Sequence, residues 1–111
     1  MATNGTASPV AGAADIFGGK GFNVLTYSGA ASYNNGIGDR VDVKLFGFQN
    51  KLIVLSPMGL SVSGTYYTIP QPANQGLTAW YLRWYILSNN QEVAGGQNLS
   101  GESIQLMGMG I

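Results

Sequence analysis

The stretch that decides the fold of this 111-residue chain is Leu77–Ser88, reading Leu-Thr-Ala-Trp-Tyr-Leu-Arg-Trp-Tyr-Ile-Leu-Ser. Successive side chains of a β-strand point to opposite faces, so the stretch can be divided into even and odd positions. At helical spacing its apolar side chains would surround the whole cylinder and leave no polar face. We therefore predict a central β-strand with one core-facing stripe, formed by the even positions Trp80, Leu82, Trp84 and Ile86.

The odd positions of this strand carry the most distinctive candidate site, Tyr81, Arg83 and Tyr85. Alternate residues of a strand lie roughly 6.5–7 Å apart on one face. A guanidinium between two phenol rings is typical of a protein interface, and the same array can stack a sugar ring. The alternative is that a second sheet covers this face and that Arg83 pairs with a carboxylate. Both interpretations stay open from the sequence.

Short strand patterns bounded by turn residues fill the rest of the chain. They favour an all-β, single-domain antiparallel β-sandwich, jelly-roll or Ig-like, with about six or seven short strands. Besides the tryptophan-rich stretch, the predicted strands are Phe22–Ser28, Arg40–Phe48, Leu52–Leu55, Leu60–Ile69 and Ser103–Met107, the last with Ile104 and Leu106 inward.

Two of these segments carry more specific expectations. In Arg40–Phe48 the alternation places Val41, Val43 and Leu45 in the core and the intervening charged residues outside. After Ile69 comes Pro70-Gln71-Pro72, and proline cannot donate to a central strand ladder. We therefore expect residues 70–72 to form an extended crossing on the surface.

Residues 1–21 are small and rich in Gly, Ala, Ser and Thr, which predicts a flexible N-terminal arm before a sandwich domain at residues 22–111. Ile16 and Phe17 are the apolar exceptions and are candidates for anchoring the arm on this domain or a neighbour. The first residues lack a basic region followed by an apolar one, so no signal peptide is seen.

The composition limits the classes of function. The chain has no histidine and no cysteine, which removes the commonest general base, the commonest metal ligand and the thiolate nucleophile. Charged residues make up 9% and balance to a net charge of zero, so nothing attracts nucleic acid. No apolar run is long enough to span a membrane. We expect no cofactor.

The acidic residues form only weak site patterns. Asn34, Asn35, Asp39 and Asp42 offer oxygen ligands that could suit Ca²⁺, but without the spacing of a calcium loop. We expect Asp39 to end the loop, Asp42 to lie on a solvated face, and no metal site. The few carboxylates are scattered along the chain, so a glycosidase-like pair is not indicated. We predict that the protein is not an enzyme.

These observations favour a non-catalytic structural protein that works by association. We expect a small sandwich subunit docking onto a larger particle, such as a minor capsid, penton or decoration protein of a virion, or a filament subunit. Its partner would be protein, either itself or a capsid-like assembly, and its location a virion or an extracellular assembly. The alternative function is a carbohydrate-binding, lectin-like module that uses Tyr81, Arg83 and Tyr85.

Overall fold

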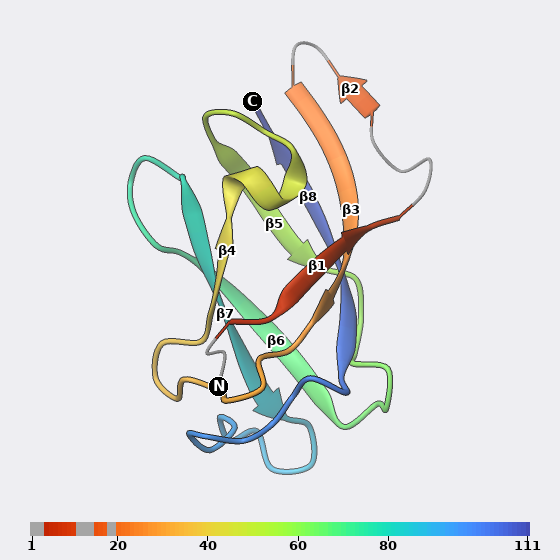
Figure 1. Cartoon of the computed structure of the whole chain (residues 1–111), viewed down its shortest axis with the longest axis vertical. Coiled ribbons are helices and arrows are strands. Elements are labelled where there is room, and N and C mark those ends of the chain that lie inside the picture. The colour runs from red at the N-terminus through yellow and green to blue at the C-terminus, as the bar shows by residue number, and fades with distance from the viewer. Residues whose placement is uncertain (1–3, 11–14, 18–19) are drawn as a thin grey trace.

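The computed structural model describes residues 4–10, 15–17 and 20–111, and shows two antiparallel sheets that form a β-sandwich (Figure 1). This confirms the predicted fold class. The first sheet has the order β1-β3-β8-β5, and β2 also pairs with β3. Its strands are β1 (Thr6–Pro9), β2 (Asp15–Phe17), β3 (Lys20–Ser28), β5 (Leu52–Pro57) and β8 (Ser103–Gly110).

The second sheet has the order β4-β7-β6, so the tryptophan-rich strand β7 (Ala79–Ile86) is central, as predicted. Its neighbours are β4 (Asp39–Asp42) and β6 (Tyr66–Pro72). Strand β4 pairs only with the first half of β7. Beyond it, the backbone N–H of Trp84 donates to the hydroxyl of Tyr33, at 3.0 Å, and its carbonyl accepts from the N–H of Val93. A loop tyrosine thus replaces the missing strand.

The core lies between the sheets and contains the even face of β7. Leu82 and Trp84 are fully buried, and Trp80 and Ile86 pack against the same cluster while partly buried. The indole Nε1 of Trp80 donates to the carbonyl oxygen of Leu52 at 2.7 Å, which ties the second sheet to the first. The predicted core stripe is therefore confirmed, and so are the inward positions of Ile104 and Leu106.

The strand predicted over Arg40–Phe48 is wrong beyond Asp42, where a 3-10 helix (Val43–Phe46) begins. The side chain of Asp42 accepts a hydrogen bond from the backbone N–H of Lys44 and caps the helix, and Gly47 ends it at a φ of 82°. Leu45 was predicted inward but is 41% exposed, whereas Phe46 is buried. A strong local cap here outweighs the alternating pattern of the sequence.

The predicted surface crossing at residues 70–72 is instead the end of β6. Pro70 pairs with Leu82, and Pro72 pairs with Trp80. Strand β6 is an edge strand, so a missing N–H can face away from the ladder. The prolines therefore protect this edge against further pairing while they extend the sheet.

The segment predicted as an N-terminal arm contributes strands β1 and β2 to the first sheet. The N–H of Gly5 donates to the hydroxyl of Tyr27 at 3.0 Å, and the side-chain oxygen of Asn4 accepts from the N–H of Arg40 in the second sheet. Strand pairing uses the backbone, so it does not require the large apolar side chains that this segment lacks. The division into arm and domain stays a prediction.

Candidate binding face on the second sheet

The odd residues Tyr81, Arg83 and Tyr85 of β7 point away from the core, onto a face that also carries side chains from both neighbouring strands. Directly opposed residues of paired strands share a face of the sheet. The register therefore brings seven residues together, and we call this set the tyrosine–arginine face: Arg40 from β4, Tyr67, Ile69 and Gln71 from β6, and Tyr81, Arg83 and Tyr85 from β7.

One end of the tyrosine–arginine face is a stacked aromatic pair. The rings of Tyr67 and Tyr85 have centroids 5.4 Å apart and planes inclined by 17°. The hydroxyl of Tyr67 donates to the side-chain oxygen of Asn90 at 3.1 Å, which fixes the outer ring. Both side chains are half-buried, so the pair presents a rigid apolar platform with polar tips.

The other end of the face is hollowed beside Tyr81 and Arg83. The hollow measures about 370 Å³ and is open to solvent. Its walls come from the loop before β4, from the end of β6 and from β7: Gly36, Ile37, Gln71, Pro72, Ala73, Tyr81 and Arg83. Tyr81 and Arg83 therefore contribute to one concave surface, while Tyr85 belongs to the neighbouring platform.

The side chain of Arg83 packs on a neighbouring loop, but its guanidinium has no ion-pair partner among the described residues. Its stem packs on Gly38, where an added Cβ would lie 3.1 Å from the Cγ of Arg83. Its Nε is buried and makes no hydrogen bond within residues 4–10, 15–17 and 20–111. The ion pair found in that part of the chain joins Arg40 to Asp42, at 4.0 Å. Among the described residues, the half-exposed Arg83 thus has no carboxylate of the kind that the covered-face alternative requires.

Asp39 is a feature that the sequence interpretation missed. The residue begins β4 and is fully buried, not at a loop end, and neither carboxyl oxygen makes a regular hydrogen bond to a described residue. Burial raises its pKa to about 6, although the polar groups of Tyr27 and Trp84 oppose this shift. In turn, burial and the charge of Asp39 raise the pKa of Tyr27. Asp39 shares the parity of Val41, and that alternation was the available signal.

The candidate calcium ligands do not converge. Asp39 lies in the core, Asp42 caps the 3-10 helix, and the side-chain amide of Asn35 donates to the carbonyl of Val93. Glu92 accepts hydrogen bonds from the hydroxyl of Tyr33 at 2.7 Å and from the N–H of Gly36 at 2.9 Å. In the described part of the chain, no group of three or more His, Cys, Asp or Glu residues could hold a metal ion.

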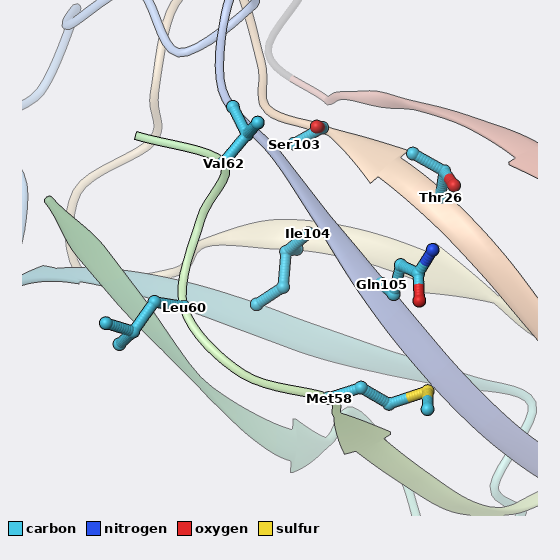
Figure 2. Close-up of a pocket in the computed structure, with 7 residues that line it drawn as sticks. All are labelled: Thr26, Met58, Leu60, Val62, Ser103, Ile104 and Gln105. Carbon is cyan, nitrogen blue, oxygen red and sulfur yellow. The ribbon is translucent and has the colours of Figure 1, made fainter. Parts of the chain in front are cut away.

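A second hollow, of about 330 Å³, lies on the first sheet, beside β8 (Figure 2). The loop after β5 forms one wall and is fastened to β8, because the N–H groups of Met58 and Val62 donate to the carbonyls of Gln105 and Ser103, each at 2.8 Å. Figure 2 shows Leu60 and Ile104 on the loop side and Gln105 near Met58. This hollow has an apolar rim, since the side chains of Met58, Leu60 and Val62 are exposed.

The other two predicted site residues, Ile16 and Phe17, lie in β2, where their backbones pair with Gly21 and Lys20 of β3. The surroundings of their side chains lie outside the described part of the structure. Whether these residues anchor the N-terminal segment on a neighbour therefore stays a prediction.

Comparisons with protein-family models, with curated proteins and with solved structures give no match for this chain. Within the described residues, no helix has the length and apolar character needed to cross a membrane. The functional inference therefore depends on the geometry and chemistry of the two hollowed surfaces.

Proposed function

We propose that this protein is a non-catalytic structural subunit that docks onto a larger particle through the tyrosine–arginine face. The particle would be a virion, with the chain as a minor capsid, penton or decoration protein, or it would be a filament. The proposed location is correspondingly a virion or an extracellular assembly. One observation carries the proposal: Tyr81, Arg83 and Tyr85 are half-exposed on the outer side of a central strand.

The position of these residues supports docking because the strand beneath them is rigid. The opposite face of β7 is buried through Leu82 and Trp84, so the backbone that carries the tyrosines is held by the core. Tyrosine and arginine are enriched among the residues that dominate binding energy at interfaces. Residues that are already fixed lose less conformational entropy when a partner binds.

The mass of the native species tests this proposal. We expect sedimentation of the source extract to place the chain in a large complex, and the purified chain to self-associate or rebind that complex. Tyr81→Ala should weaken the association, whereas Lys44→Ala, an exposed change off this face, should not. A monomeric mass in both the extract and the purified sample would overturn the proposal.

The second candidate function is carbohydrate binding, favoured by the hollow beside Tyr81 and the nearby stacked pair Tyr67–Tyr85. Aromatic faces and a few hydrogen-bonding groups are what a sugar ring requires. A glycan array that gives a signal with the wild type and none with Tyr81→Ala, for a chain that does not assemble, would favour this function over docking.

A further inference from the structure

We propose that the hollow beside Tyr81 and Arg83 accepts a carboxylate, presented by an aspartate or glutamate side chain of the docking partner. The inference rests on the proposed function, because it names the chemistry by which the tyrosine–arginine face recognises its partner. Its basis is the hollow itself, the unpaired guanidinium of Arg83 and the distribution of charge around them.

The face carries one cation that the described part of the chain does not neutralise. Arg40 pairs with Asp42, but the guanidinium of Arg83 has no carboxylate within 4.0 Å among the described residues. The carboxylate of Glu92, whose backbone bridges Tyr85 at the edge of the same sheet, already accepts hydrogen bonds from Tyr33 and Gly36. Charge complementarity therefore calls for an anion supplied by the partner.

The lining of the hollow offers the donors that a carboxylate accepts. Arg83 is half-exposed, and its terminal nitrogens, unlike its Nε, are not among the buried atoms that lack a hydrogen-bond partner in the described residues. Tyr81 and Gln71 line the same hollow, and the hydroxyl of the one and the amide of the other make no hydrogen bonds to other side chains in residues 4–10, 15–17 and 20–111. A guanidinium with neighbouring neutral donors matches the planar, bidentate geometry of a carboxylate.

The charged groups of this face disfavour two other partners, a nucleic acid and a second copy of this chain. A nucleic acid requires several cations along its backbone, whereas this hollow has one unpaired arginine. Binding between two copies through this same face would not supply an uncommitted acid, because Asp42 pairs with Arg40 and Glu92 accepts hydrogen bonds from Tyr33 and Gly36. A carboxylate on a different surface provides one negative charge for one positive charge.

The test is a titration of the folded protein followed by nuclear magnetic resonance of the Arg83 Nε–H group. The probes are N-acetyl-aspartate amide and its uncharged match, N-acetyl-asparagine amide. We expect a saturable shift at Arg83 with the aspartate probe only, and a weaker shift at high salt. Arg83→Gln, monitored at Gln71, should weaken binding at least about tenfold, because it removes the charged hydrogen-bond donor to the carboxylate. The control Lys44→Gln, which removes an exposed cation outside this face, should bind normally.

The assembly readout separates this inference from the proposed function. Excess N-acetyl-aspartate amide should inhibit the association measured by sedimentation, and the asparagine probe should not. Equal shifts with both probes, or no shift with either, would overturn the carboxylate site even if Tyr81→Ala still abolished assembly. Conversely, a shift at Arg83 with the aspartate probe only, in a chain that never associates, would support the carboxylate site and refute docking.

Discussion

The two faces of β7 differ in how far they are covered by the rest of the protein. On the inner face the indole of Trp80 donates across the sandwich to Leu52, and the buried Trp84 fills the space between the sheets. On the outer face Tyr81 and Arg83 line an open hollow, and the Nε of Arg83 has no partner in the described structure. The inner face is buried within the sandwich, although Nε1 of Trp84 also lacks a hydrogen-bond partner in the described structure. The outer face has donors and aromatic surface left over, which is the physical basis for assigning it to a partner.

The largest expected difference between the faces is the cost of removing an aromatic ring. Trp84→Ala should lower the free energy of unfolding by about 3–5 kcal/mol, because it loses buried apolar area and leaves a cavity. Tyr81→Ala on the outer face should cost less, because its ring is half-exposed. Thermal and urea denaturation of both variants check this. Equal losses would show that the two faces are equally structural.

Asp39 is the exception on the inner side, and it makes stability depend on pH. Below pH 3.8 its carboxyl is neutral in the folded and the unfolded chain alike. As the pH rises, the unfolded chain ionises first, while the folded carboxyl keeps its proton until about pH 6. The free energy of unfolding therefore falls between these values, by about 3 kcal/mol at most, and stays lower above them.

Asp39→Asn should remove that penalty, because the amide has a similar shape and no charge. We expect the free energy of unfolding at pH 7.5 to rise by about 1–3 kcal/mol, with little change below pH 3.8. Denaturation curves across this range measure it, and the matched control is Asp42→Asn, since asparagine caps a helix as well as aspartate does. Destabilisation of the Asp39 variant at neutral pH would mean that the buried charge is compensated.

The stacked pair Tyr67–Tyr85 tests whether the outer face has internal order of its own. A double-mutant cycle with Tyr67→Ala and Tyr85→Ala should give a coupling energy of about 0.5–1.5 kcal/mol, as for other aromatic pairs. Additive losses would indicate that the rings move independently in solution, and the face would then be a less preorganised docking platform.

The smallest expected effect on folding is that of Arg83→Ala. The residue makes no ion pair in the described structure, so we expect the free energy of unfolding to change by no more than about 0.5 kcal/mol. The same variant should lose association in sedimentation. A strongly destabilised Arg83→Ala would assign the arginine to the fold and end the case for a binding face.

The alternation of residues 79–86 was sufficient to predict the central strand, its core stripe and the all-β class. Successive side chains of a strand point to opposite faces whatever surrounds the strand. It also grouped Tyr81, Arg83 and Tyr85 on one face. The pattern failed after Asp42, where a side-chain cap and Gly47 replaced the strand with a 3-10 helix. Such local hydrogen bonds from side chains to the backbone compete with strand pairing. Apolar periodicity alone does not show which of the two forms.

Only the tertiary structure decided what surrounds each of these residues. The hollow beside Arg83 has walls from the loop before β4 and from the end of β6, and the burial of Asp39 depends on packing near Tyr27 and Trp84. These neighbours are distant in the chain: those around the hollow meet when β4, β6 and β7 pair, and Tyr27 meets Asp39 only when the two sheets pack together. Sequence periodicity tells which side of a strand a residue occupies, whereas pairing between strands determines whether that side is covered, hollowed or left open.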